Sequence, residues 1–314
     1  MKKLLLLSLA ILCSQVIFAQ ESEQEDDKPK EGWIGTGTFS LLFNQAAFNA
    51  EWQGGGTSNY AGNATISYNL NYNKDNFTWD NTFLGDFGLT KVKDQDFTRK
   101  TNDRLELNSV AGWEISDSNW YYSVFANFRT QFAKGYKYSE QDVIDVTTGN
   151  VVGTEVVRTE TTHFMSPGYL QVGPGMLWKK NDNFKVNIAP ATARFIFVDD
   201  QFTTLPGYED GDYFGVDQGE SMRFEFGASV SAYAKFDVVE NVSFENMINL
   251  YSNYLEDPQN VDLDYTGKLN MKVNDYLSAN FIFQTVYDDN AVRAFQVREV
   301  LGVGFTYKIN PQEE

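Results

Sequence analysis

His163 is the only histidine of the chain and therefore the first residue to consider for catalysis. Ser166 follows it closely, where a long connecting segment leads into a strand-like run. A serine nucleophile needs a histidine base within hydrogen-bond reach of its hydroxyl group and a third group that orients this base. One histidine near several serines provides only part of that arrangement. We therefore expect no catalytic residues and keep a lipid-modifying membrane enzyme as an alternative.

The segment 199–217, DDQFTTLPGYEDGDYFGVD, is a second candidate for chemistry. Its carboxylates are Asp199, Asp200, Glu209, Asp210, Asp212 and Asp217. Oxygen ligands in a glycine-containing loop can bind a hard cation such as Ca²⁺. The spacing lacks the regular Asp order of an EF-hand loop, however. We therefore interpret the segment as a hydrated surface loop and expect no metal or other cofactor.

The elements that carry these residues alternate in polarity with a period of two. In 60–72, Tyr60, Ile66, Leu70 and Tyr72 share one face, and asparagine, serine and threonine fill the other. The segments 222–238 and 261–273 repeat the pattern. Successive side chains of a strand point to opposite faces, so each segment predicts a strand with one apolar and one polar face. In a membrane barrel the apolar face contacts lipid, and the aromatic residues at its ends lie near the two interfaces.

About twelve such strands follow one another and predict a single closed antiparallel up-and-down transmembrane β-barrel over residues 33–310. The predicted strands are 36–44, 59–73, 77–90, 101–116, 119–133, 168–180, 183–199, 221–238, 241–255, 260–273, 276–288 and 295–309. Every second connection is a short turn with Asn or Asp, which is typical of a β-hairpin. The others are mostly longer, as in bacterial outer-membrane barrels. A soluble β-sandwich has no reason to segregate its connections in this way.

The polar face of these strands should line the barrel lumen and is the remaining candidate site. The lumen-lining candidates are Asp80, Asp86, Glu106, Glu114, Arg129, Gln131, Arg223, Glu225, Lys268 and Lys272. The set mixes both signs of charge, so these side chains could neutralise one another and fill the lumen. A barrel of this size lies between filled barrels of about eight strands and open porins of about sixteen. A narrow, partly occluded pore is the widest opening that we expect.

The two ends of the chain lie outside the predicted barrel. Residues 1–19 have a positively charged start, a short apolar run and a small residue at the end, which is typical of a secretory signal peptide. Residues 20–32 are charged and predict a disordered acidic leader, and residues 311–314 a periplasmic tail. The only cysteine, Cys13, falls within the signal peptide, so a mature chain has no disulfide bonds.

Composition limits the partners. The formal net charge of −18 disfavours nucleic acid and anionic membrane surfaces. We expect contact with outer-membrane lipid, with the barrel-insertion machinery during biogenesis, and with an unknown protein partner. An even number of strands places both termini in the periplasm.

Several segments resemble an outer-membrane barrel family of the Bacteroidota that is catalogued as domain of unknown function 3078. The first is FNQAAFNAEWQGGGTSNYAG at 43–62, and others are RKTNDRLELNS at 99–109, NWYYSVFANFRTQFAKGY at 119–136, FMSPGYLQVGPGM at 164–176 and IAPATARFIFV at 188–198. The resemblance covers about residues 33–309. Its N-terminal signature falls on Asn44, Gln45, Trp52, Gly54, Gly55 and Gly56, where it implies a plug or lid. The resemblance implies an outer-membrane localisation and a barrel fold but no activity.

We therefore expect an outer-membrane barrel with a structural or partner-binding role or a narrow passive channel, and no catalysis. The alternatives are a small-solute channel or transporter and a lipid-modifying enzyme.

Overall fold

The computed structural model describes residues 31–49, 51–53, 56–116 and 118–309. The predicted signal peptide, residues 20–30 of the predicted leader, Gly54, Gly55 and the predicted tail lie outside these residues. Within them, no helix is both long and apolar enough to cross a membrane.

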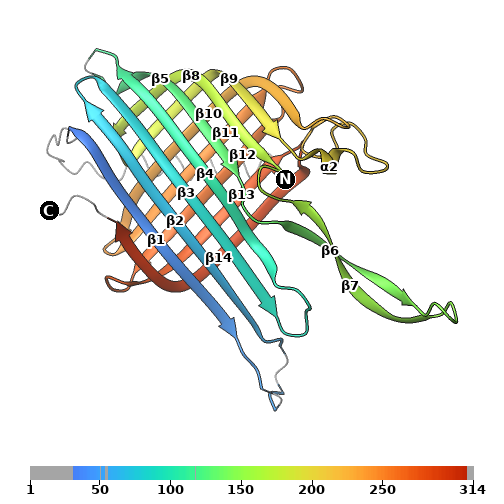
Figure 1. The fold of residues 1–314 in the computed structure, drawn as a ribbon. Coiled ribbons are helices and arrows are strands. Elements are labelled where there is room, and N and C mark those ends of the chain that lie inside the picture. Colours follow the sequence, from blue (N-terminus) through green and yellow to red (C-terminus); the bar gives the residue numbers. More distant parts are fainter. Residues whose placement is uncertain (1–30, 50, 54–55, 117, 310–314) are drawn as a thin grey trace. The chain divides into compact units, whose positions relative to one another are not determined.

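The described chain forms a closed barrel in which all neighbouring strands are antiparallel (Figure 1). Its strands are β1 (Gly32–Ala46), β2 (Asn59–Lys74), β3 (Phe77–Val92), β4 (Arg99–Glu114), β5 (Trp120–Thr130), β8 (Gly168–Asn181), β9 (Phe184–Phe197), β10 (Met222–Val239), β11 (Val242–Asn253), β12 (Val261–Lys272), β13 (Leu277–Asp288) and β14 (Val292–Ile309). Each strand pairs with the barrel strands that precede and follow it in the chain, and β1 closes the sheet on β14, where Phe43 pairs with Val303. The predicted fold class and the predicted strand number are confirmed.

The short connections take the backbone conformation that their residues favour. Asp75, between β2 and β3, has a φ of 49°, and Asn241, between β10 and β11, has a φ of 64°. Two-residue hairpin turns that match the twist of the sheet need positive φ, which Asn and Asp tolerate better than other side chains. The longer connections all lie at the other end of the barrel (Figure 1).

A β-bulge in β9 changes which side chains face the lumen. Before Pro190, Asn187 and Ala189 are buried inside, whereas after it the buried residues include Thr192 and Arg194. The pairing of β9 with β10 shifts by one residue between these positions. An extra residue reverses the alternation of faces and also accommodates a proline, which cannot donate a ladder hydrogen bond.

The neighbouring strand β8 accommodates this bulge with glycines. A Cβ atom on Gly173 would lie 2.5 Å from the carbonyl oxygen of Ala191, and one on Gly175 would lie 2.6 Å from that of Ile188. Both distances are far below van der Waals contact, so the two backbones can approach this closely only because β8 has no side chain there.

The outer wall of the barrel is apolar and rich in aromatic residues. At the end with the short turns, the Trp33 ring lies 5.1 Å from Tyr72 and 5.6 Å from Trp79, and Phe77 lies 5.1 Å from Trp113. Between the ends, outward side chains include Leu107, Val124, Phe224 and Leu301, each at least 47% exposed. An exposed apolar band of this kind is the lipid-facing surface of a transmembrane barrel.

The long connection between β5 and β8 contains a hairpin that the sequence analysis did not predict. β6 (Gly135–Ile144) and β7 (Val151–Thr162) pair with each other in a separate two-stranded sheet. This hairpin extends well beyond the ends of the barrel strands (Figure 1). The sequence analysis expected no strand between residues 133 and 168, because the hairpin lacks the continuous apolar face by which the barrel strands were recognised.

Candidate functional site

Four charged side chains from both walls meet in the middle of the lumen. Arg104 on β4 contacts Asp264 on β12 with a distance of 3.1 Å between Nη2 and Oδ2, and it also contacts Glu106 at 2.5 Å. Arg129 on β5 reaches the same Asp264 oxygen at 2.6 Å. Asn127 donates a hydrogen bond of 2.7 Å to Glu106. Five strands separate β4 from β12 in either direction around the barrel, so these contacts cross its full width.

A second cluster is centred on Arg194 of β9. The guanidinium group contacts Asp262 through Nη1 and Asp288 at 3.2 Å through Nη2, and Nη1 lies 3.6 Å from Glu225. The Arg194 and Glu225 side chains are 3% and 1% exposed. A charge buried this deeply is stable only when it is paired, so the carboxylates hold the guanidinium in place.

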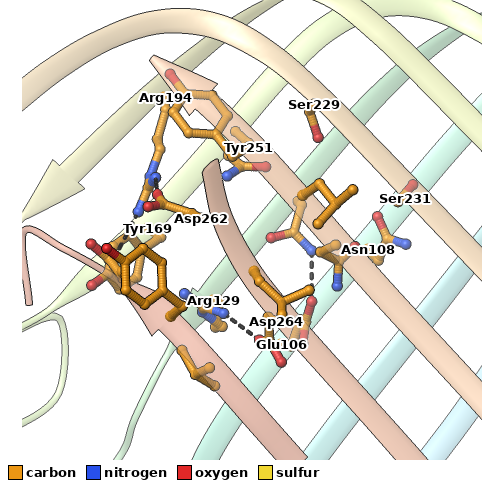
Figure 2. Close-up of a pocket in the computed structure, with 18 of the residues that line it drawn as sticks. Glu106, Asn108, Arg129, Tyr169, Arg194, Ser229, Ser231, Tyr251, Asp262 and Asp264 are labelled. Atoms are coloured by element: carbon orange, nitrogen blue, oxygen red, sulfur yellow. Dashed lines mark hydrogen bonds and ion pairs between the residues drawn. The ribbon is translucent and has the colours of Figure 1, made fainter. Parts of the chain in front are cut away.

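The Tyr169 ring connects the two clusters. The guanidinium carbon of Arg129 lies 4.8 Å from its centroid, and that of Arg194 lies 5.1 Å from it. Arg194 also lies over the Tyr251 ring at 4.8 Å. Guanidinium groups at these distances are attracted to the aromatic face. Figure 2 shows Tyr169 between Arg129 and the Arg194–Asp262 pair.

The space that these side chains leave is small. They surround a cavity of about 50 Å³, which Glu106, Arg129, Tyr169, Arg194 and Asp264 help to line (Figure 2). A single water molecule needs roughly 10–15 Å³ of such space, so the cavity accommodates a few waters. These side chains therefore leave little free space in the lumen at the level of the two clusters.

Two further ion-pair groups lie against β3. The Asp80 carboxylate contacts Lys179 of β8 at 2.8 Å and Lys185 of β9 at 3.1 Å, and its side chain is 3% exposed. Nearer the long-loop end, Arg298 of β14 lies 3.5 Å from Asp86, which also accepts a hydrogen bond of 2.7 Å from Asn63. These contacts add to the polar filling of the lumen.

The structure places the predicted lumen residues in different surroundings. Six lie in the networks: Asp80, Asp86, Glu106, Arg129, Arg223 and Glu225. Gln131 lies just beyond β5 and accepts hydrogen bonds from Lys100 and Thr162. Lys272 contacts Asp275 of the adjacent turn and is largely exposed. Glu114 lies at the short-turn end of β4 and Lys268 within β12, and neither has an ion-pair partner in the described part of the chain.

Several central residues were absent from the predicted set. They are Arg104, Lys179, Lys185, Arg194, Asp262, Asp264, Asp288 and Arg298. Arg104 and Asp264 share the strand face of predicted residues and could have been found by extending the alternation. Arg194 could not, because the bulge at Pro190 reverses the alternation before it.

The described signature residues, Asn44, Gln45, Trp52 and Gly56, lie at the rim. Asn44 and Gln45 end β1, where they pair with Ala61 and Tyr60. Trp52 is 58% exposed, with its ring 6.1 Å from Phe48, and Gly56 has a φ of 107°. None of the described residues of this segment lines the cavity. At the level of the cavity, the described lining consists of side chains of the strands.

The acidic segment 199–217 uses several carboxylates to order its own backbone. Asp199 caps α2 (Asp200–Thr203) by accepting a hydrogen bond from Gln201 N, and Asp210 accepts one from Gln218 N. Burial raises the pKa of Tyr213, in the same loop, to about 12. Elsewhere among the described residues, the carboxylates of Asp262, Asp288 and Asp289 approach one another closely enough for a cation. Arg194 already pairs with two of them.

His163 does not contact the Ser166 side chain. Its Nδ1 lies 2.8 Å from Glu160 and its Nε2 lies 3.3 Å from Asp199. The Ser166 hydroxyl is fully buried and accepts a hydrogen bond from Asp199 N. The histidine therefore joins the base of the β6–β7 hairpin to the β9–β10 loop. The two residues considered for nucleophilic catalysis are held by other partners.

Fold and site together define a closed antiparallel β-barrel with a charged lumen that ion pairs cross. Residues 43–136 match the model of a family described as "Protein of unknown function (DUF3078)". The predicted resemblance is confirmed over this segment, which runs from the end of β1 to the start of β6. No curated protein matches the chain.

Solved structures with a similar course of the chain are membrane barrels. The translocator domain of the autotransporter NalP from Neisseria meningitidis shares 9% identity, with a TM-score of 0.35 and 90% of each chain covered. The COG4313 outer membrane channel from Pseudomonas putida F1 shares 10% identity, with a TM-score of 0.37 and coverage of 91% of this chain and 99% of the channel. The CymD monoaromatic hydrocarbon channel shares 8% identity, with a TM-score of 0.33 and 90% of each chain covered. At these identities and TM-scores the likenesses carry no weight. The barrel fold rests on the strand pairing.

Proposed function

We propose that this protein is an outer-membrane β-barrel that is closed in the conformation described here and has a structural or partner-binding role without catalysis. Three observations support localisation in the outer membrane: the closed strand ladder, the apolar aromatic outer wall and the segregation of short and long connections. A bilayer accepts only segments whose backbone groups are paired internally, and a closed barrel meets that requirement.

The Arg104–Asp264 contact carries the proposal of a closed lumen. It joins strands on opposite walls, and Arg129 reaches the same carboxylate from a third strand. A solute would have to break these ion pairs to pass. Removing a buried charge from its partner costs roughly 3–5 kcal/mol, so the closed arrangement is strongly favoured at rest.

A narrow channel for small solutes is the second candidate function. The observation that favours it is the chemistry of the closure, which consists of ion pairs and not of a packed apolar core. Hydrated ions can replace such partners if the side chains rearrange, whereas an apolar plug offers them none.

Conductance in planar bilayers distinguishes these functions. We expect the wild-type protein to insert without a stable current, and the triple variant Arg104→Ser, Arg129→Ser, Asp264→Ser to conduct, because three long side chains leave the lumen. Lys272→Ser, at the rim, is the matched control and should stay silent. A stable current through the wild-type protein would refute the closed barrel and support the small-solute channel.

The membrane localisation of the protein and the orientation of its termini need separate tests. A folded barrel should migrate differently on gels before and after boiling. Identical migration together with a soluble fractionation profile would refute the membrane localisation. We also propose that both termini face the periplasm, because β1 begins and β14 ends at the short-turn end. Protease added to intact cells should then cleave the β6–β7 hairpin and leave an N-terminal epitope tag, fused after the signal peptide, intact.

A further inference from the structure

The distal half of the β6–β7 hairpin exposes aliphatic side chains that nothing in the described chain covers. Val146 is 99% exposed at the tip, and the flanking residues Ile144, Val151 and Val152 are 58–63% exposed. We call Val143, Ile144, Val146, Val151 and Val152 the hairpin tip. Clustered apolar side chains on an otherwise polar surface mark an interaction site.

The tip is held in an ordered turn. The Asp145 carboxylate accepts hydrogen bonds from Thr147 N at 2.7 Å and from Thr148 N at 3.3 Å, which lowers the pKa of Asp145. Asp145 N donates to the Asn150 carbonyl at 2.9 Å, and Gly149 supplies a φ of 70°. The turn therefore presents Val146 to solvent in a defined geometry.

The base of the hairpin is fixed to the barrel. Arg99, at the start of β4, lies over the Tyr138 ring at 4.6 Å, and the Phe97 ring lies 5.7 Å from the same tyrosine. Lys134, directly before β6, contacts Glu160 of β7 at 2.6 Å and so closes the base of the hairpin. The proximal half thus packs against the barrel rim, whereas the distal half projects away from it (Figure 1). An isolated two-stranded hairpin is marginally stable at best in water, so its distal half gains most from a partner.

Charge selects the kind of partner. Residues 139–157 carry the carboxylates Glu140, Asp142, Asp145 and Glu155, and they contain no lysine or arginine. Complementary charge steers association and like charge opposes it. A second copy of this tip would bring the same carboxylates together, and an anionic lipid surface would repel them.

We propose that the hairpin tip is the docking site for a protein whose contact surface combines an apolar depression with surrounding lysine and arginine side chains. The inference rests on the proposed function, because it names the kind of protein that the proposed partner-binding barrel would bind. The unpaired strand edges of β6 and β7 add backbone groups to which such a partner can hydrogen-bond.

Photocrosslinking in intact cells of the source organism tests this docking site. The full-length protein carries p-benzoylphenylalanine in place of Val146, and a control carries it in place of Val124 on the lipid-facing wall. We expect a protein adduct from position 146 alone, mapped to an apolar peptide with neighbouring lysine or arginine. No protein adduct, an adduct to a second copy or to lipid, or an adduct to a surface without basic residues would overturn the proposal.

Two sets of substitutions then separate the apolar and the charged contributions. Ile144→Ser with Val151→Ser removes aliphatic contact, and Glu140→Gln with Asp142→Asn and Glu155→Gln removes charge. Asp145 stays because it orders the turn. Both sets should lower the adduct yield several-fold, and unchanged yields would contradict the proposal.

The same samples distinguish this inference from the closed-barrel proposal. Gel migration before and after boiling reports whether each variant has folded, and bilayer recordings report whether its lumen is closed. A folded, silent barrel without an adduct refutes the docking site alone, whereas a conducting wild-type protein refutes the closed barrel alone.

Discussion

Arg104 and Asp264 contact each other at 3.1 Å although five strands separate them in either direction around the barrel. Few ion pairs in a barrel can span opposite walls, because two side chains must bridge the lumen. Here Arg129 reaches the same carboxylate, so Asp264 neutralises two guanidinium groups from the facing wall. The contact across the lumen therefore depends on one acidic residue of β12.

Asp264→Asn should destabilise the barrel by about 3–5 kcal/mol, because Arg104 and Arg129 lose a buried counter-charge. Replacing all three with apolar residues, as Arg104→Met, Arg129→Met and Asp264→Leu, should cost less, since no charge is left unpaired. Urea unfolding in lipid vesicles measures both. An Asp264→Asn variant as stable as wild type would show that the network contributes nothing to stability.

Asp80→Asn should weaken the barrel for a related reason at the β3–β8–β9 wall. Its carboxylate is the shared partner of Lys179 and Lys185, and the Lys179 side chain is 5% exposed. Asp275→Asn is the matched control, because the Asp275–Lys272 pair is exposed and such pairs contribute little. The temperature at which the folded gel band disappears should fall for Asp80→Asn and stay unchanged for Asp275→Asn.

Gly173→Ala should impair folding, because the added Cβ atom would collide with the Ala191 carbonyl oxygen in the β9 bulge. A methyl group at Gly153, in the hairpin, meets nothing within 4 Å and provides the control. The yield of the heat-modifiable form after refolding from urea compares the two. Equal yields would mean that the bulge can move away from β8.

The base of the hairpin should loosen in acid. The hydrogen bond from Lys134, followed by that from His163, lowers the pKa of Glu160 below its ordinary value of 4.5. A lowered carboxylate pKa stabilises the folded form above the unfolded pKa, and this contribution is lost as the pH falls through the folded pKa. The hairpin base should therefore be ordered above the ordinary glutamate pKa of 4.5 and loosen as the pH falls below it.

Limited proteolysis of the hairpin over this pH range, with an acid-active protease, measures the effect. Glu160→Gln should make cleavage nearly independent of pH between 3 and 6 (roughly the range in which a carboxyl group titrates). Glu155→Gln, on the distal half of β7, is the control and should retain the wild-type profile. A wild-type profile without any acid-dependent increase would exclude Glu160 as the group that fixes the base.

The sequence by itself determined the barrel. Apolar and polar side chains alternate along β2, β10 and β12 because each strand has one face toward an apolar phase and one toward a polar interior. Local turn chemistry at Asp75 and Asn241 then determined where these strands reverse. Both kinds of information lie within a few residues of one another, so no tertiary contact was needed to recognise them.

Only the tertiary structure decided which lumen residues meet across the barrel. The Arg104–Asp264 contact depends on the diameter and closure of the barrel, which no local pattern encodes. The bulge at Pro190 turned Arg194 inward and so created the second cluster, since one extra residue reverses the faces of all that follow. The β6–β7 hairpin was not predicted because its distal half packs against nothing in the described part of the chain, so no buried face imposed an alternation on its residues.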